Sequence, residues 1–550
     1  MPPFGQYRRP WQQFRQLRAD LDEVDAREKI AFAFRLPVEM RRFLRSRHSL
    51  QSAREGLQEA IESRSTRFLE LARTQIYEQQ SSPYLRLLCS AGCELSDLRQ
   101  LVREQGLESA LERLACAGVY LTSEEFKGRR TVVRGSLSFD VSPGDFDPPP
   151  SVHGFATESS GTRTAPTRGV ASFDWLGQEA LAAAPFLAAH DLLSCSHAAL
   201  DVVLPGAGSM FLLKLAKLDI APEKWFALRV PFDNRVAAAY QYLMAAETVL
   251  LAKWFGPGFP APELVTVGDM KPVVDWLAGQ VARGRTCCVR TVASNAARIA
   301  RTASSMAVSL EGVTFIASGE PMTDPKREII ENTGARWTLL YGYMPGPIHV
   351  AYGCADPSCI DDMHLNLHTL AVVEHTRQLA GLDSPIRPLL FTTLYPSAAK
   401  LQLNVENGDI ATLERRQCGC ALGSAGLGVH IHHVRSFEKF TSEGVAYEHS
   451  HLLEALERVL PNRFGGGPGD YQLLEEEDDD GRTRLTLLVD PQIGSIDDEA
   501  ALDCLKNELA GGPRTNRYIS RLWSQAGTLR LCRRAPIASA RGKVLPLRIQ

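Results

Sequence analysis

A run of small, hydroxylated and basic residues between Glu158 and Gly169 has the composition of a phosphate-binding loop. It reads Glu-Ser-Ser-Gly-Thr-Arg-Thr-Ala-Pro-Thr-Arg-Gly. Small residues let backbone N–H groups approach a ligand closely, and hydroxyl and guanidinium groups donate further hydrogen bonds to phosphate oxygens. Runs of Ser, Thr and Gly also form ordinary surface loops, so the composition alone leaves both interpretations open.

Two close pairs of cysteines are the second set of residues that could do chemistry. Cys354 and Cys359 are separated by four residues, and Cys418 and Cys420 by a single glycine. Thiolates in two close pairs suit a tetrahedral structural zinc, and the glycine eases the tight approach of the second pair. His364 is a substitute ligand if Cys359 does not reach. The alternative is that the four residues are small buried side chains of a reduced protein.

The elements that must position these residues alternate between strands and helices from residue 173 to residue 390. The expected strands are 201–204, 286–289, 313–317 and 337–340, and the expected helices are 237–252, 294–307 and 324–332. This alternation predicts a mainly parallel sheet with helices on its faces. Ligands bind beyond the carboxyl ends of such strands, where the turns 205–208, 318–321 and 341–342 fall.

The remaining segments predict three parts of the chain. Residues 1–66 form a helical N-terminal extension, a cap or partner-facing layer, in which no chemistry is visible. Residues 67–435 form the large domain, in which residues 136–150, rich in Pro, Gly and Asp, are expected to be an exposed linker. Residues 436–550 form a small C-terminal α/β domain. We interpret His430, His432 and His433 as structural or surface residues, with His433 on the opposite strand face from the other two.

Composition excludes several classes of protein. The chain has 550 residues, a net charge of -3 and 12 cysteines. This charge gives no bulk electrostatic attraction to nucleic acid or to an anionic membrane. We find no secretory signal and no spanning helix, and twelve cysteines in so long a chain indicate reduced thiols or a metal. A cytoplasmic enzyme is therefore expected.

The order of the motifs resembles the phenylacetate–CoA ligase branch of the adenylate-forming enzymes, from about residue 67 to the end of the chain. The residues that carry the resemblance are Ser159–Thr162, Pro166, Thr167, Ser318–Pro321, Tyr341, Gly342, Thr392–Leu394, Gly408, Asp409, Arg435, Gly444 and Arg541–Lys543. The resemblance implies an α/β fold, with a large domain of mixed and parallel sheets flanked by helices and a small, mobile α+β C-terminal domain. It also implies a Cys/His metal cluster in the region of the cysteine pairs.

The resemblance assigns roles to individual residues. The nucleotide would be held by Ser159, Ser160, Gly161, Thr162, Arg163, Thr167, Ser318, Gly319, Glu320, Pro321, Tyr341, Gly342, Asp409 and Arg435. Asp409 would accept hydrogen bonds from the ribose hydroxyls, Arg435 would mark the hinge to the small domain, and Lys543 would neutralise charge that develops between the acid and the α-phosphate. The acid pocket would be lined by Phe155, Gly206, Gly208, Phe232 and Tyr240.

The implied reaction joins a carboxylic acid, aryl or small acyl, to ATP with Mg²⁺, giving acyl-AMP and pyrophosphate. A thiol then attacks, and CoA is the expected acceptor. Two alternatives stay open: transfer to an amine or a carrier protein in the biosynthesis of a specialised metabolite, and a catalytically degenerate fold that acts as a binding partner. No nucleic acid or membrane partner is expected, and a homodimer is left open.

Three departures from the family pattern bear on catalysis. Arg163, Thr164 and Ala165 stand where the family has Thr-Gly-Lys or Thr-Gly-Gln. The Tyr-Gly motif continues into Tyr-Met-Pro, so neither Met344 nor Pro345 supplies the carboxylate that usually holds Mg²⁺. Losing that ligand costs several kcal/mol of transition-state stabilisation unless another group replaces it. At the hinge, a phenylalanine (residue 437) stands where the family has an aspartate.

Overall fold

The computed structural model describes most of the chain. The residues outside the description are 1–22, 159–167, 204–205, 229–234, 267–268, 320, 323, 344–347, 378–384, 386, 437–438, 443–444, 449–451, 453–454, 468, 478–482, 511–528, 538–546 and 550. Among the described residues, no helix combines the length and apolar character needed to cross a membrane.

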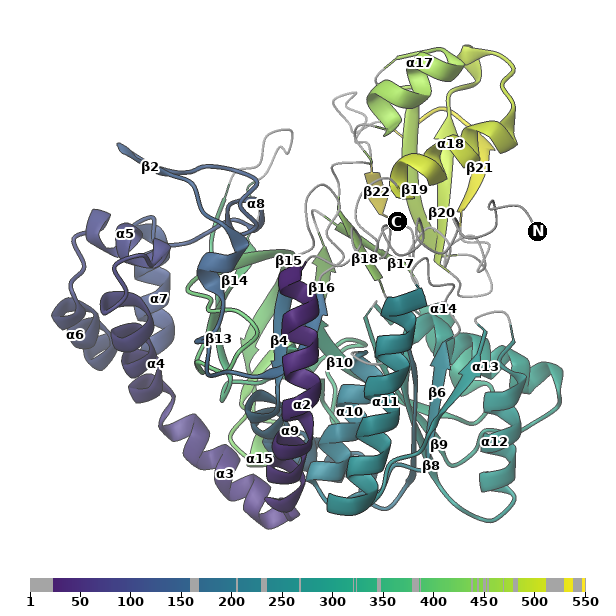
Figure 1. The fold of residues 1–550 in the computed structure, drawn as a ribbon. Coiled ribbons are helices and arrows are strands. Elements are labelled where there is room, and N and C mark those ends of the chain that lie inside the picture. The colour runs from purple at the N-terminus through teal and green to yellow at the C-terminus, as the bar shows by residue number, and fades with distance from the viewer. Residues whose placement is uncertain are drawn as a thin grey trace, which may run out of the picture.

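A 12-stranded mixed sheet organises the large part of the molecule (Figure 1). Its parallel half contains, in spatial order, β7 (Pro262–Val265), β6 (Lys224–Leu228), β5 (Ser196–Asp201), β8 (Cys287–Val292), β9 (Val313–Ser318) and β10 (Arg336–Tyr343). Its antiparallel half continues with β11 (Ile348–Gly353), β12 (Met363–Leu365), β16 (Val429–Ser436), β15 (Val405–Arg415), β14 (Pro388–Thr393) and β13 (Leu370–Glu374). The predicted α/β class and the parallel strands are confirmed.

Helices cover both faces of the parallel half. They are α9 (Phe173–Ala189), α10 (Ala207–Lys217), α11 (Arg235–Phe255), α12 (Lys271–Val281), α13 (Ala293–Ser305) and α14 (Asp324–Glu331). Alternate strand residues enter different cores: Cys288 packs with the α9–α11 side, whereas Cys287 and Val289 pack with the α12–α13 side. This alternation follows from the two-residue period of a strand and explains why β8 is apolar on both faces.

The N-terminal helices are part of the large body. α2 (Glu23–Arg45) lies beside α11 in Figure 1, and α3 (Leu50–Glu62) packs on α9. Leu36, Met40 and Leu57 are fully buried in the core that covers one face of the sheet. The described part of the helical extension therefore contributes to this core.

A third core covers the antiparallel half. It is built by α4 (Arg64–Ala72), η1 (Arg73–Tyr77), α5 (Pro83–Ser90), α6 (Leu95–Gln105), α7 (Leu107–Cys116), α8 (Ser123–Phe126), β1 (Val132–Arg134), β2 (Leu137–Phe139) and η2 (Pro143–Phe146). The expected exposed linker at 136–150 is wrong, because Phe139 and Phe146 are buried in this core. Lys400 also ties the segment down by donating to the carbonyl of Pro143 at 2.8 Å.

The C-terminal region has its own core and a four-stranded sheet, drawn at the top of Figure 1. Its elements are β17 (Lys439–Ser442), β18 (Val445–Glu448), η3 (Ala455–Val459), α17 (Leu460–Phe464), β19 (Tyr471–Glu477), β20 (Thr483–Val489), η4 (Pro491–Ile493), α18 (Asp498–Ala510), β21 (Leu529–Arg533) and β22 (Leu547–Ile549). The smaller C-terminal α/β unit matches the expectation from sequence.

Candidate functional site

The carboxyl ends of four parallel strands lie next to one another at one edge of the large sheet. Ser318 at the end of β9 pairs with Leu340 of β10 on one side and with Val292 of β8 on the other. β5 joins the other side of β8 through the pair Ala199–Arg290. Parallel strands bring their carboxyl ends to the same edge, which is where open α/β sheets bind ligands.

A hydrogen-bonded cluster of Tyr341, Asn407 and Asp409 lies at this edge. The Tyr341 hydroxyl donates to Oδ2 of Asp409 at 2.6 Å, and the Asn407 side-chain amide donates to the same oxygen at 2.8 Å and to the tyrosine oxygen at 3.0 Å. The Asp409 backbone N–H donates to Oδ1 of Asn407 at 3.0 Å. The carboxylate is thus oriented by two donors but is only partly buried, so it can accept further hydrogen bonds.

Local backbone features place these side chains. β10 pairs with β11 with a register shift between Tyr341 and Gly342, and such irregularities re-aim side chains beside functional sites. On β15, Gly408 has φ +89°, a conformation that favours glycine, between Asn407 and Asp409. The backbone conformation therefore explains the glycine at position 408, while the expected ribose contact would explain the aspartate at position 409.

A buried arginine connects the next two predicted positions, Ser318 and Gly208. The guanidinium of Arg290, on β8, donates to the Ser318 hydroxyl at 2.8 Å and forms an ion pair with Asp201 at 2.5 Å. The Asp201 carboxylate accepts the Gly208 N–H at 2.9 Å, at the start of α10. An added Cβ at Gly208 would lie 2.7 Å from Cβ of Asp201, so a glycine is required for this approach.

Other predicted site residues are distributed as follows. Gly319 follows β9 with φ +82°, Pro321 is exposed and Arg435 pairs with Ile410 in β16. Gly206 precedes α10, and Tyr240 lies partly buried on α11. The residues predicted for the site that lie outside the described residues are Ser159, Ser160, Gly161, Thr162, Arg163, Thr167, Phe232, Glu320 and Lys543.

Phe155 belongs to the apolar core. It is 4% exposed, and its ring centroid lies 5.2 Å from that of Phe32 and 5.5 Å from that of Phe173. It sits on β3 (Gly154–Glu158), which pairs with β4 (Arg168–Ser172) as an antiparallel hairpin. Glu158 and Arg168, the residues on either side of the segment 159–167, pair with each other at the ends of these strands.

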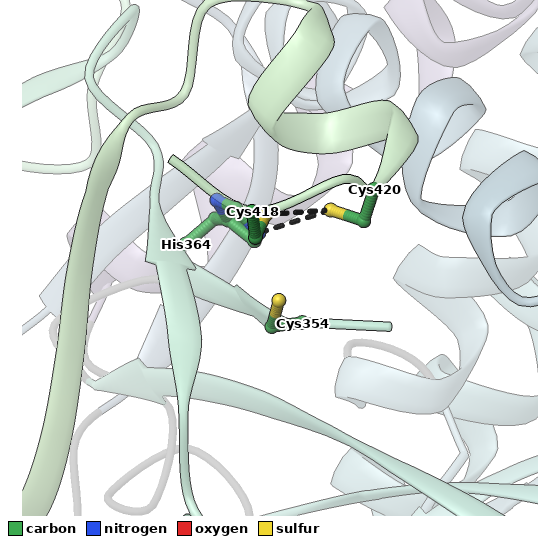
Figure 2. A group of neighbouring side chains, drawn as sticks. All are labelled: Cys354, His364, Cys418 and Cys420. Carbon is green, nitrogen blue, oxygen red and sulfur yellow. Dashed lines mark hydrogen bonds between the residues drawn. The ribbon is translucent and has the colours of Figure 1, made fainter. Parts of the chain in front are cut away.

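The cysteines and one histidine come together on the antiparallel side of the sheet (Figure 2). Potential ligand atoms of Cys354, His364, Cys418 and Cys420 all lie within 4.8 Å of one another. Nε2 of His364 is 3.1 Å from Sγ of Cys420 and 3.4 Å from Sγ of Cys418, and the two sulfurs are 3.3 Å apart. Figure 2 shows the sulfur of Cys354 pointing toward the other three side chains. Three thiols and one imidazole are a common donor set for structural zinc.

The surroundings orient this donor set. Nδ1 of His364 lies 2.6 Å from the carbonyl oxygen of Leu427, which holds the Nδ1–H tautomer and leaves the Nε2 lone pair facing the sulfurs. Arg416 donates to Sγ of Cys354 at 3.6 Å and pairs with the buried carboxylate of Asp362. Hydrogen bonds from Cys354 and His364 lower the pKa of the Cys420 thiol, although its burial acts in the opposite direction.

Two expectations about this cluster can be compared with the structure. Cys359, expected as the fourth ligand, lies in a different group with His432 and His433, and His364, the expected substitute, lies with the other three cysteines. The tight approach does not depend on the glycine between the paired cysteines, because a Cβ at Gly419 would meet nothing within 4 Å. It depends on Gly423, where a Cβ would lie 3.0 Å from Sγ of Cys418.

Three further residues of the candidate site were not singled out from the sequence. Asn407 carries a visible signal, since it stands two residues before Asp409 on the same strand. Arg290 is a charged residue within the buried strand Cys-Cys-Val-Arg-Thr-Val, and Asp201 ends a buried strand. Burying a charged side chain in an otherwise apolar strand costs free energy unless the charge is paired. Such a residue in the sequence therefore indicates an oppositely charged partner at the sheet edge.

With this geometry, the fold is that of the adenylate-forming enzymes. A crystal structure of 2-hydroxyisobutyryl-CoA ligase with 2-hydroxyisobutyryl-AMP and CoA is 15% identical, has a TM-score of 0.50 and aligns over 89% of this chain and 90% of that chain. The chain is also similar, at TM-scores of 0.40 and 0.36, to o-succinylbenzoate CoA synthetase of Bacillus subtilis and to an amide bond synthetase of Marinactinospora thermotolerans. Each is 12% identical; the alignments cover 72% and 84% of this chain and 69% and 92% of the other chains. No protein-family profile and no curated protein matches the chain.

Proposed function

We propose that the protein uses ATP to activate a carboxylic acid as an acyl-adenylate and then transfers the acyl group to a thiol, with CoA as the acceptor. The observation that carries the proposal is the oriented carboxylate of Asp409 beside the ring of Tyr341, at the carboxyl edge of the parallel strands. A carboxylate can accept hydrogen bonds from both hydroxyls of a ribose, and the neighbouring aromatic ring offers a surface on which adenine can stack.

The proposed nucleotide site extends from this pair. The segment 318–321 and Tyr341 would form the adenine pocket, and the hairpin connection that holds Ser159, Ser160, Gly161, Thr162, Arg163 and Thr167 would bind the β- and γ-phosphates. The hydrogen bond from Arg290 to Ser318 holds the first residue of this adenine segment on the adjacent strand β8. Mg²⁺ bound with the nucleotide would supply positive charge that offsets the charge of the phosphates, although Met344 and Pro345 stand where the family has the carboxylate that usually holds this ion.

The proposed chemistry has two steps. A carboxylate oxygen of the acid attacks the α-phosphorus of ATP, and the bond to the β-phosphate oxygen breaks to release pyrophosphate. Lys543, delivered by the C-terminal unit, would stabilise the charge that develops between the acid and the α-phosphate. The thiol sulfur then attacks the acyl carbon and AMP leaves; rotation of residues 436–550 about Arg435 would separate the two steps.

The acid would bind next to the start of α10. Gly206 and Gly208 lie at this point, where the Gly208 N–H donates to Asp201 and Asp201 pairs with Arg290, so these polar groups would lie beside the acid. Tyr240 on α11 and Phe232 complete the proposed pocket. Phe155 is buried in the apolar core, where its ring neighbours are Phe32 and Phe173.

The four-residue Cys/His group is proposed to hold a structural Zn²⁺. Its three thiols and one imidazole fit the ion, and the hydrogen bond from His364 to the Leu427 carbonyl supplies the outer support that zinc-binding histidines usually have. The ion would join β11, β12 and the segment between β15 and β16, where α15 (Ala421–Ser424) begins. It would therefore stabilise the antiparallel half of the sheet and take no part in the reaction.

Acid-dependent exchange of radiolabelled pyrophosphate into ATP tests adenylation directly. A panel of aryl and short-chain acids should contain at least one that supports exchange. The Lys543→Ala variant should lose at least 100-fold in exchange rate, while Lys506→Ala, at a partly exposed lysine of α18 paired with Asp503, should retain wild-type exchange. Absence of exchange with every acid, although ATP binds, would refute adenylation.

The acceptor is tested in the same preparations. Consumption of CoA thiol at the rate of AMP release is the expected result. At positions 163–165 and 344–345 this sequence departs from the family's motifs, which favours a second candidate function, transfer of the acyl group to an amine or a carrier protein. Exchange without CoA consumption, followed by acylation of an added amine or phosphopantetheine-bearing carrier, would establish that candidate in place of the first.

A further inference from the structure

We propose that Cys359, His432 and His433 form a second metal site, separate from the four-residue Cys/His group, that binds a divalent transition metal such as Zn²⁺. Ligand atoms of these three residues lie within 4.8 Å of one another. The site shares no residue with the first group, and it does not depend on the proposed ligase activity. One thiolate and two imidazoles suit Zn²⁺, Co²⁺ or Ni²⁺.

The two histidines face each other because β16 contains a bulge. Consecutive residues of a strand ordinarily point to opposite faces. Here Thr412 pairs with His432 while Ile410 pairs with Arg435, so a two-residue step of β15 opposes a three-residue step of β16. The additional residue is His433, whose φ of 55° lies in the left-handed region.

The result is a convergent pair of ring nitrogens. Nδ1 of His432 lies 3.0 Å from Nδ1 of His433, and the ring planes are inclined by 80° with centroids 4.6 Å apart. A non-glycine residue in the left-handed region costs on the order of 1 kcal/mol, and such strain gathers at ligand-binding positions. The bulge therefore gives adjacent residues an arrangement that two ligands of one ion require and that a regular strand forbids.

The third ligand is delivered by a separate, anchored loop. Cys359 lies between β11 and β12, and its sulfur is 3.7 Å from Oδ1 of Asp361. The other oxygen of Asp361 accepts the N–H of Val434 at 3.0 Å, which fixes this loop against the residue that follows the bulge. The cysteine loop and the histidine strand are thus joined by a contact that needs no metal.

A carboxylate also supports the outer side of the pair. Oε2 of Glu414 lies 3.5 Å from Nε2 of His432. A carboxylate at Nε2 favours a proton on that nitrogen and leaves the lone pair on Nδ1, which is the arrangement around many metal-binding histidines. Cys359 and His432 are partly buried and His433 is exposed, so an ion can enter from solvent and keep water in its remaining position.

Metal titration of the full-length protein, already saturated with one equivalent of Zn²⁺, tests the proposal with Co²⁺ as the probe. We expect one further equivalent to bind with a thiolate-to-Co²⁺ charge-transfer band. Cys359→Ser should abolish that band, and His433→Asn should weaken the binding at least tenfold. Asparagine tolerates the left-handed backbone, so His433→Asn removes the imidazole and keeps the bulge.

Control variants separate this site from other binding. His375→Gln removes a histidine whose ring contacts that of Tyr120 and that belongs to neither group, so it should leave the second equivalent unchanged. Cys418→Ser should reduce the tightly bound Zn²⁺ while the Cys359-dependent band persists. The proposal is overturned if no saturable Co²⁺ binding follows loading with one equivalent of Zn²⁺, or if Cys359→Ser and His433→Asn bind Co²⁺ as wild type does.

Discussion

The hydroxyl of Tyr341 donates a 2.6 Å hydrogen bond to the carboxylate of Asp409, 68 residues further along the chain. Tyr341 stands near the end of the last parallel strand, and Asp409 on a strand of the antiparallel half. The contact therefore spans the two halves of the sheet. Because Asn407 donates to the same carboxylate oxygen, the orientation of Asp409 is set before any ligand arrives.

Replacement of Asp409 by alanine should weaken ATP binding by at least about 100-fold. Two hydrogen bonds to an ionised acceptor are lost, each worth about 1.5–3 kcal/mol. Tyr341→Phe keeps the ring and removes only the orienting hydroxyl, so a smaller loss, about tenfold at most, is expected. Calorimetric titration with a non-hydrolysable ATP analogue measures both.

Asp324→Asn is a matched control for the aspartate variant. Asp324 is exposed at the start of α14 and pairs with Arg327, so its loss should leave nucleotide affinity unchanged. Wild-type affinity in the Asp409→Ala protein, with an unchanged melting temperature, would contradict the proposed ribose contact.

Removal of the proposed structural zinc should destabilise the protein. Cys420→Ser should release about one equivalent of zinc and lower the melting temperature by several degrees, since binding free energy at such a site is also folding free energy. Cys89→Ser, at an exposed free cysteine, is the control. Elemental analysis and thermal unfolding report the two effects independently. Less than half an equivalent of zinc in the purified wild type would reject the ion.

Periodicity predicted the parallel half of the sheet well, because its strands are buried on both faces and read as apolar runs. The expected strand at 313–317 is observed as β9, Val313–Ser318. The strand placed at 201–204 was shifted, since β5 contains a serine and a buried histidine, His197, and ends at Asp201. The antiparallel half was missed where β12 is three residues long and has His364 at its centre.

Residue types predicted which kinds of side chain form the candidate sites better than they predicted how these side chains are arranged. The spacing of four cysteines indicated a metal cluster, with His364 as the alternative to Cys359, but which of these two residues joins the group depends on the pairing of β11 with β12. The convergence of His432 and His433 cannot be read from a two-residue period, because the bulge is a property of the register between two strands. A short motif gives the residue types that can bind a ligand, whereas the pairing register between distant strands determines which side chains come into contact.

A buried charged triad joins the helices to the sheet. Nζ of Lys214 on α10 lies 3.2 Å from Glu179 on α9 and 2.6 Å from Nδ1 of His349 on β11, and both charged side chains are fully buried. Burial raises the pKa of Glu179, but Lys214 and His349 more than offset this effect and hold it at about 2. The carboxylate is therefore ionised and depends on its partners.

Lys214→Met should lower the free energy of unfolding by about 3–5 kcal/mol, because it leaves a buried carboxylate without its cation. Adding Glu179→Gln to this variant should restore part of the loss, since the uncompensated charge is then gone. Urea denaturation of the wild type, the two single variants and the double variant gives the coupling energy. A single-variant loss below about 1 kcal/mol would show that the triad contributes little to stability.

The stability of the fold should fall as the pH drops from about 6.5 to about 4. Burial lowers the pKa of His197 and of His368 from 6.5 to about 4 in the folded protein. Above pH 6.5 both histidines are neutral in the folded and the unfolded state. Between pH 6.5 and 4 the unfolded chain takes up the protons first, which lowers the free energy of unfolding by roughly 1.4 kcal/mol per pH unit for each histidine.

Nε2 of His197 faces the carbonyl of Leu192 at 2.8 Å, and Nε2 of His368 faces the carbonyl of Gln178 at 2.9 Å. His197→Gln and His368→Gln keep a donor near this position and remove the titrating group. Urea midpoints at pH 7, 6 and 5 should therefore decline less steeply in each variant than in the wild type. His153→Gln, at a partly exposed ring that faces Arg35, should follow the wild-type decline. Equal slopes in all four proteins would mean that neither buried histidine governs acid stability.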